Sequence, residues 1–246
     1  MWGKGGKSGG RPVAARPIQA GHLAVKLLLD PSEASCVLGR QGTMIRQIAT
    51  DTGTELHLSQ RDQYYPGTTL QELRITGPTE QGVLDAENRV FNQIQQNVGY
   101  ICCGESNVKP GDVRVRFIVP NLVARVIIGK GGENIKQMRA QTTMHVHVDQ
   151  QNVPPGPAGP TTEQVLCLGG PVAGLPTALS LATNYYAQAT QEEWFASWAS
   201  NSNCGIEIPG MWLTLDNRSG GKGGKMDGKM GGKGMDMMGM GMGMGM

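Results

Sequence analysis

Two short glycine turns carry the clearest chemistry in this sequence: GRQG at residues 39–42 and GKGG at residues 129–132. Each follows an apolar stretch and precedes a segment with helical spacing. The start of a helix presents unpaired backbone N–H groups and the positive end of the helix dipole, which together bind anions. Glycine lets a phosphate approach the backbone, and a cation between the glycines adds charge. Each turn predicts a phosphate-binding site, although tight turns between packed helices also use glycine.

Both turns lie inside a longer internal repeat. VLGRQGTMIRQIATDTGTELHLS at 37–59 aligns without gaps to IIGKGGENIKQMRAQTTMHVHVD at 127–149. Apolar positions are kept while the letters between them change, which indicates one small domain present twice. The identical context of the two turns favours a shared function for them. A P-loop is excluded because no GxxxxGK[ST] follows a strand in either copy.

The elements that must position these turns have the same order in both copies. Periodicity predicts a strand, a short helix, a second helix, two strands and a long helix. We expect Ser32, after Pro31, and Asn121, after Pro120, to start the short helices. The segments are 22–30, 32–38, 43–51, 54–59, 71–76 and 83–94, then 113–119, 121–128, 133–141, 144–149, 163–168 and 175–186. The order β-α-α-β-β-α predicts the α+β class, with helices on one face of a three-stranded antiparallel sheet in each copy.

The repeat sets the predicted domain organisation. The first domain covers 21–98, a short linker or tether 99–111, and the second domain, with an extended C-terminal helix, 112–200. A Trp-containing extension covers 201–216. The ends, 1–20 and 217–246, are rich in glycine, and the second is also rich in methionine. We expect both ends to be disordered, because glycine maximises chain entropy; a thioether site for Cu(I) is the alternative for the second.

The formal net charge is +2, but it is unevenly distributed. The two ends are cationic, and the body between them is mildly acidic, which excludes a uniformly basic chromatin-type protein. Five cysteines without a CxxC pair fit a reducing compartment. No segment is apolar for long enough to span a membrane, and the N-terminus lacks a secretory signal; a mitochondrial transit peptide is the alternative.

These residues resemble a family. IIGKGGxxIKxMR in the second copy and, more loosely, VLGRQGxxIRxI in the first resemble type I KH domains, particularly the tandem ones of poly(C)-binding and Nova-like proteins. The resemblance covers about residues 21–190. It implies a non-enzymatic protein of the nucleus or cytoplasm, without cofactor or metal. It would bind single-stranded RNA, or DNA, about four nucleotides per domain, with the glycine turn clamping the backbone.

The resemblance also implies the nucleic-acid-binding residues. They would be Gly39, Arg40, Gln41, Gly42, Ile45, Arg46 and Leu56 in the first copy, and Gly129, Lys130, Gly131, Gly132, Ile135, Lys136, Arg139 and Val146 in the second. Arg139 stands where cytosine-binding members contact base edges, whereas the first copy has Ala49 there, so a pyrimidine preference is expected only in the second. Gln71 and Gln164 replace a second arginine, and Arg125 replaces a small residue.

Other residues allow two interpretations. Trp194 and Trp198 lie one helical turn apart, on an expected continuation of the last helix, and either complete the core or form a partner or dimer surface. Tyr64 and Tyr65 either stack on bases or are exposed loop residues. The strand pair His145 and His147 fits solvated positions better than a metal site, because no third ligand accompanies it.

The predicted function is therefore RNA binding in post-transcriptional control of mRNA, through stability, splicing or translation. The alternative is a protein-interaction scaffold with degenerate KH folds, which the acidic body favours. An enzyme is not supported, since no paired carboxylates or nucleophile–base motif emerges.

Overall fold

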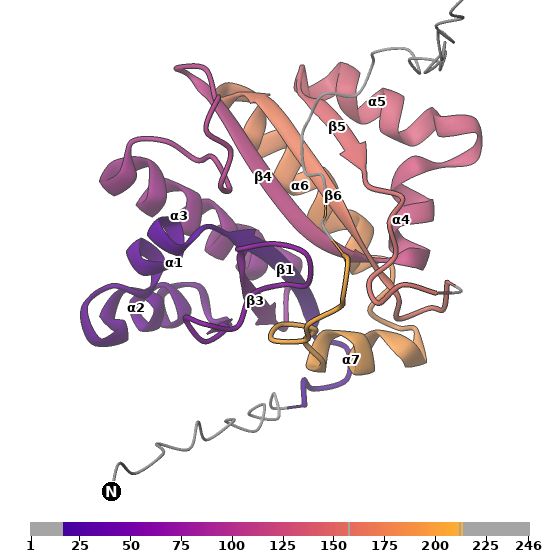
Figure 1. The fold of residues 1–246 in the computed structure, drawn as a ribbon, viewed down its shortest axis with the longest axis horizontal. Coiled ribbons are helices and arrows are strands. Elements are labelled where there is room, and N and C mark those ends of the chain that lie inside the picture. Colours follow the sequence, from indigo (N-terminus) through magenta and orange to yellow (C-terminus); the bar gives the residue numbers. More distant parts are fainter. Residues whose placement is uncertain (1–16, 157, 212, 214–246) are drawn as a thin grey trace, which may run out of the picture.

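The computed structural model describes residues 17–156, 158–211 and 213, and it contains the predicted repeat (Figure 1). The first copy comprises β1 (Leu23–Leu29), α1 (Pro31–Leu38), α2 (Thr43–Thr52), β2 (Glu55–Leu58), β3 (Gln71–Gly77) and α3 (Glu80–Val98). The second comprises β4 (Asp112–Pro120), α4 (Asn121–Ile128), α5 (Glu133–Thr142), β5 (His145–Val148), β6 (Glu163–Pro171) and α6 (Leu175–Ala187). The α+β class is confirmed. The predictions for the two tails concern residues outside the described ranges, except for residues 17–20. There Ile18 donates its N–H to the Ser200 hydroxyl at 3.0 Å and packs against the core, so the predicted disorder does not extend to this end of the first tail.

One helix differs from its prediction. The last helix of the second copy does not continue through the tryptophans: α6 ends at Ala187, and α7 (Glu193–Ser200) follows after a turn. The change of direction buries Phe195 and Trp198, which are each 1% exposed, against the rest of the protein. Burial of these two aromatic rings favours the turn between α6 and α7 over a continuous helix.

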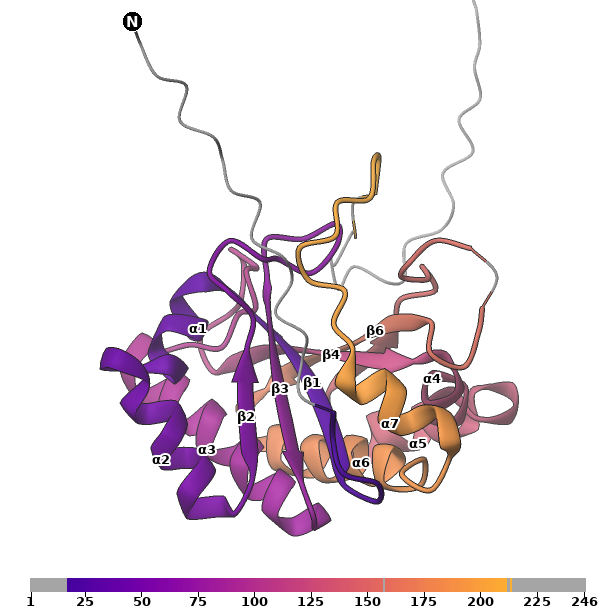
Figure 2. The same ribbon diagram turned by 90° about the horizontal axis from the view of Figure 1, so that it is seen from below.

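The two copies share one six-stranded sheet with the order β2-β3-β1-β4-β6-β5. β1 and β4 join the halves as antiparallel neighbours, with Leu27 opposite Phe117 and Leu28 opposite Arg116. Each of these strands would otherwise be the edge of a three-stranded sheet with unpaired backbone groups. Their pairing, together with contact between α3 and α6 on the helical face (Figure 2), fixes the two domains against each other.

The α3–α6 contact buries a carboxyl group. Glu87 is fully buried and accepts a hydrogen bond of 2.6 Å from the Thr183 hydroxyl. Burial raises the pKa of Glu87 to about 8, because the charged form is poorly solvated there.

This burial predicts a pH-dependent stability. Between the ordinary carboxyl pKa, about 4.5, and about 8, the unfolded chain releases the proton that folded Glu87 retains. The free energy of unfolding therefore falls as pH rises through this range. The protonated Glu87 makes its full contribution to stability only below about pH 4.5, the lower end of the range. E87Q should remove this component and stabilise the protein more at about pH 8 than at about pH 5. Urea unfolding at both pH values measures it; D85N, at an exposed site on the same helix, should leave the pH dependence unchanged.

The sheet face opposite α1–α6, here called the open face, carries a second hydrophobic core. It is built from both domains, from residues 99–111 between them and from the chain after α7. Its members are Leu28, Tyr65, Leu70, Cys103, Ile118, Val153, Val165, Cys167, Cys204, Met211 and Leu213. Ile101, Cys102 and Cys103 are buried, so this part of residues 99–111 is packed against the domains rather than forming a free tether. Tyr65 is fully buried, so both interpretations, base stacking and an exposed loop residue, are wrong for it, whereas Tyr64 is half-buried.

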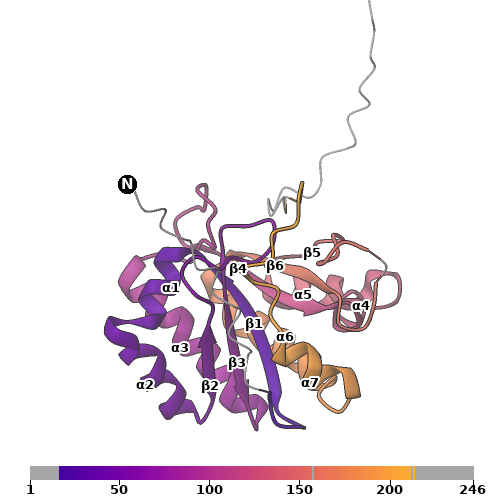
Figure 3. The same ribbon diagram turned by 60° about the horizontal axis from the view of Figure 1, so that its bottom comes forward.

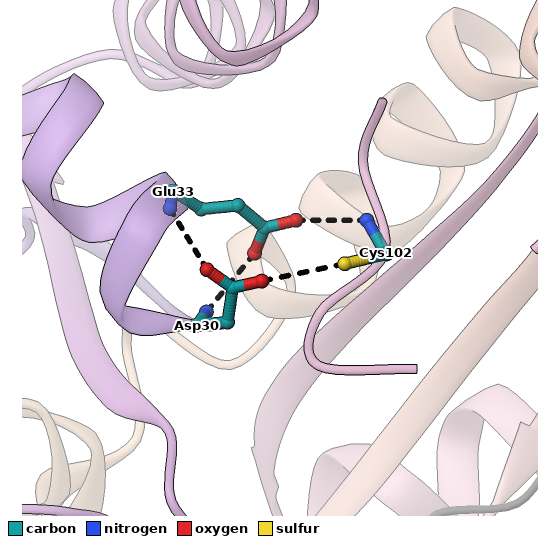
Figure 4. A group of neighbouring side chains, drawn as sticks. All are labelled: Asp30, Glu33 and Cys102. Carbon is teal, nitrogen blue, oxygen red and sulfur yellow. Dashed lines mark hydrogen bonds between the residues drawn. The ribbon is translucent and has the colours of Figure 1, made fainter. Parts of the chain in front are cut away.

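The start of α1 is attached to these connecting residues (Figure 4). Asp30, rather than the predicted Ser32, caps the helix: its carboxylate accepts the backbone N–H groups of Ser32 and Glu33. Glu33 accepts the N–H groups of Cys102 and Cys103, and the Cys102 thiol donates to Asp30. The Asp30 N–H donates to the second carboxylate oxygen of Glu33 at 3.0 Å, so all four carboxylate oxygens of Asp30 and Glu33 accept hydrogen bonds. Burial raises the pKa of Cys102 to about 12, so its thiol remains protonated. The cluster therefore joins the connecting residues to α1.

Trp198 lies in an interior polar cluster between the domains. Its indole N–H donates to Glu163, and its ring lies 4.5 Å from the Lys26 ammonium. Lys26, fully buried on β1, donates to Glu163 at 2.9 Å and to the Asn201 carbonyl at 2.7 Å. Trp198 is therefore not available to a partner, whereas Trp194 is half-exposed. Within the described part of the chain, no helix combines the length and apolar character needed to span a membrane.

Candidate nucleic-acid interface

The two glycine turns have the same backbone conformation. Gly39 and Gly129 end α1 and α4 with φ values of 68° and 71°. Single-turn 3-10 helices then follow over Arg40–Gly42 and Lys130–Gly132. The first glycine is required by space as well as by φ. A Cβ at Gly39 would lie 2.6 Å from the Cβ of Met44, and one at Gly129 would lie 2.7 Å from the Cγ of Asn134.

Each turn ends at a helix start that no side chain caps. Gly42 and Gly132 occupy the N-cap positions of α2 and α5 in the left-handed conformation, with φ values of 73° and 78°. Because glycine has no side-chain acceptor, the first-turn N–H groups lack the usual capping oxygen. The positive end of the helix dipole lies at the same place. Both helix starts are therefore available to an anion such as a phosphate.

Basic side chains surround both turns. Arg40 and Lys130 are exposed inside them. From the following helices, Arg46 donates to the Gln41 carbonyl at 2.8 Å, and Lys136 lies 3.4 Å from the Gly131 carbonyl. In each domain one cation thus lies within the turn and a second folds back over it. This arrangement brings together the predicted turn residues and the first cation of the following helix.

The apolar residues assigned to the groove differ between domains. In the first domain, Ile45 and Leu56 are half-buried, so part of each side chain remains accessible. In the second, Ile135 is 9% exposed and Val146 is fully buried. The side chain of Val146 therefore belongs to the core, which corrects its assignment as an accessible groove wall. Val126 on α4 is 43% exposed, but it lines a hollow together with residues of α6 and α7.

Arg139 joins α5 to the edge strand β5. Its Nε and Nη2 atoms donate to the Val146 carbonyl at 2.9 and 2.6 Å. The guanidinium is thereby held beside the edge of β5, and Ala49 cannot make this contact in the first domain. The side-chain amides of Gln71 and Gln164 donate to the Ser59 and Gln150 carbonyls, so they hold loops rather than replace an arginine at the interface.

One surface feature was not predicted from the sequence. Leu122, Val126, Tyr185 and Trp194 line a hollow of about 280 Å³ between α4, α6 and the start of α7. The residues come from three separate segments that only the tertiary fold brings together. In the sequence, this hollow was indicated only by the pair Trp194 and Trp198, and of these two residues only Trp194 lines it.

The comparisons with known proteins agree with this architecture. The KH domain family matches residues 24–92 and 114–183, and the chain belongs to this family. Among curated relatives, the RNA-binding protein Pasilla of Drosophila melanogaster is 28% identical over 131 residues, which cover 52% of this chain and 17% of Pasilla. The RNA-binding protein Nova-2 of Homo sapiens is 27% identical over 190 residues, which cover 71% of this chain and 36% of Nova-2.

The chain thus spans about a third or less of the length of these two relatives. Among solved structures, Dim2p from Pyrococcus horikoshii OT3 aligns over 72% of this chain and 97% of its own. The identity is 13%, and the TM-score is 0.25.

Proposed function

We propose that this protein binds single-stranded RNA with both KH domains and acts in post-transcriptional control of mRNA in the nucleus or cytoplasm. The observation that carries the proposal is the pair of uncapped helix starts, each with the same left-handed glycine cap and two nearby cations. A phosphodiester backbone matches this pattern of N–H groups and positive charge. The names of the relatives Pasilla and Nova-2, both RNA-binding proteins, support RNA as the ligand, with single-stranded DNA as the alternative.

The order of the strands separates the two candidate grooves, so a single RNA would have to contact two sites that are far apart. The grooves adjoin β2 and β5, which are the opposite edges of the six-stranded sheet. Five strand intervals of roughly 4.8 Å separate these edges, or about 24 Å across the sheet. One RNA that occupies both grooves therefore has to bridge this width with nucleotides bound to neither.

Base preference is proposed to differ between the domains. The guanidinium of Arg139, held at the edge of β5, can donate to the acceptor edge of a cytosine, and Ala49 cannot. Selection from a random RNA pool tests this with the full chain, one turn being inactivated at a time. We expect cytosine enrichment when only the second domain is active, and loss of that enrichment in R139M. The domain with Ala49 serves as the internal reference. Enrichment that persists in R139M would show that Arg139 does not read the base.

A protein-binding scaffold is the second candidate. The hollow beside Trp194 favours it, because Leu122 and Val126 expose apolar surface at its rim, 37% and 43% respectively. Such a surface fits a partner protein or a second copy of the chain. Inactivation of both glycine turns, described in the Discussion, distinguishes this candidate from RNA binding.

A further inference from the structure

The chain that follows the second domain returns to the first. α7 lies beside β1 on the open face (Figures 2 and 3). Residues 201–211 and 213, here called the return segment, continue along the loop between β2 and β3. This loop, residues 59–70, begins directly after Leu58. Leu56 and Leu58 form the half-buried face of β2, at the candidate groove. The loop therefore determines how the groove-side strand ends.

Backbone hydrogen bonds attach the return segment to this loop at two points. The Gly205 N–H donates to the Tyr64 carbonyl at 2.9 Å, and the Leu213 N–H donates to the Gly67 carbonyl at 3.1 Å. The approach is close at both points. A Cβ on Gly205 would lie 3.3 Å from the Cγ of Gln63, and one on Gly67 would lie 3.1 Å from the backbone nitrogen of Leu213.

Apolar burial reinforces these bonds. Met211 and Leu213 are 6% and 8% exposed, and they belong to the same core as Tyr65 and Leu70 of the loop. Cys204, at the beginning of the return segment, is also buried in this core. The loop thus has a packed partner along its length, and that partner comes from the far end of the chain.

Polar contacts anchor the return segment to the sheet itself. Ser202 donates to Glu72 on β3 at 2.9 Å, and Asn203 donates to Glu163 on β6 at 2.7 Å. Arg74 on β3 donates to the Ala199 and Ser200 carbonyls at the end of α7. The segment is therefore fixed to both domains before it reaches the loop.

We propose that the return segment is a positioning element for RNA binding by the first domain. It holds loop 59–70 and, through it, the end of β2, so that the groove is ordered before RNA arrives. This inference rests on the proposed function. In the second domain, Val153 of the corresponding loop shares the core of Met211 and Leu213, but the hydrogen bonds that hold the loop come from that domain's own residues. Val153 pairs with Glu163, and Gln164 contacts Gln150 and Asn152. The effect should therefore be confined to the first domain.

The test uses the full chain with the second turn inactivated by K130D/G131D, so that RNA binding reports the first domain alone. In this parent, M211S/L213S should weaken binding of single-stranded RNA by about five- to tenfold. The loop would then be mobile in the free protein, and RNA binding would have to order it at a cost in conformational entropy. Amide hydrogen exchange in residues 59–70 should accelerate. G205A should give a smaller effect in the same direction. I206S is the matched control, because Ile206 lies in the same segment but is 50% exposed, and it should leave binding unchanged.

The reciprocal parent, R40D/Q41D, reports the second domain alone. There M211S/L213S should leave RNA binding within about twofold of the parent, which also shows that the variant is folded. Equal losses in both parents would overturn the inference, because the segment would then only maintain the fold. Unchanged binding by the first domain despite faster exchange of the loop would overturn it as well. Failure of K130D/G131D itself to bind RNA would instead refute the proposed function of the first domain, and the inference with it.

Discussion

Aspartate in both glycine turns, R40D/Q41D combined with K130D/G131D, is expected to weaken single-stranded RNA binding by about 100-fold or more at low ionic strength. Each substitution pair replaces a cation beside an uncapped helix start and adds negative charge where the phosphate would lie. The change therefore opposes the ligand at the same N–H groups that are proposed to bind it. Fluorescence anisotropy with a labelled RNA pool measures the loss, and each single-domain variant should lose less than the combination.

The structure predicts that these variants fold. Arg40 and Lys130 are exposed, and a Cβ at Gly131 would meet nothing within 4 Å. Gln41 already adopts a left-handed conformation with φ 53°, which aspartate tolerates better than most residues. An acidic side chain near a helix N-terminus also interacts favourably with the dipole. The melting temperature and circular dichroism should therefore stay close to those of the unmodified protein.

A matched control separates local from overall charge. N107D/K109D changes the net charge by the same amount as the pair in one turn, at exposed positions between the domains. It should cost far less affinity than either turn variant, and the cost should vanish as salt is raised. RNA binding that survives in the folded four-site variant would rule out the proposed interface. If binding of a protein partner also survived there, the scaffold alternative would account for the chain.

The second large effect concerns stability. K26M is expected to lower the free energy of unfolding by about 3–5 kcal/mol, because it leaves the buried Glu163 carboxylate without its cation. Lys26 and Glu163 are 2.9 Å apart, with side chains 0% and 2% exposed, and they belong to different domains. The Trp198 and Asn203 donors remain, but they do not neutralise the charge. Urea unfolding at neutral pH measures the change.

Two further variants test this explanation. R89M breaks the Arg89–Asp51 pair, whose side chains are 50% and 36% exposed, and it should cost less than about 1 kcal/mol. K26M/E163Q removes the buried charge and should recover part of the loss of K26M while it keeps an acceptor for Trp198. A cost for K26M no larger than that for R89M would contradict the assignment of this pair as a fixed link between domains.

The local elements followed closely from the amino-acid sequence. Apolar spacing at Ile45 and Ile48, and alternation from Glu55 to Leu58, reflect the different periods of helices and strands, so α2 and β2 begin and end near their predicted limits. The glycine turns were predictable for a similar reason. The conformation at Gly39 and Gly129 needs both positive φ and the absence of a side chain, and glycine alone meets both requirements at low cost.

Contacts between distant segments were not predictable from the residues that make them. Nothing local distinguishes a Trp198 that packs between domains from one on a partner surface, because the decision depends on Lys26 and Glu163, far away in the sequence. The buried Tyr65 is a similar case, since its partners come from distant segments. The Asp30 cap is different, because its partners Ser32 and Glu33 are neighbours in the sequence, and the Asp30–Glu33 spacing of a capping box was a local signal for it.

By itself, the sequence determined that this protein contains one small α+β domain twice, and that each copy has a glycine turn at a helix start. These features could be predicted because short-range periodicity and backbone conformation depend on neighbouring residues. Only the tertiary structure decided that β1 and β4 merge the copies into one sheet and that the return segment closes over loop 59–70. Burial of apolar surface and satisfaction of edge hydrogen bonds select these arrangements, and both depend on segments that meet only after the chain has folded.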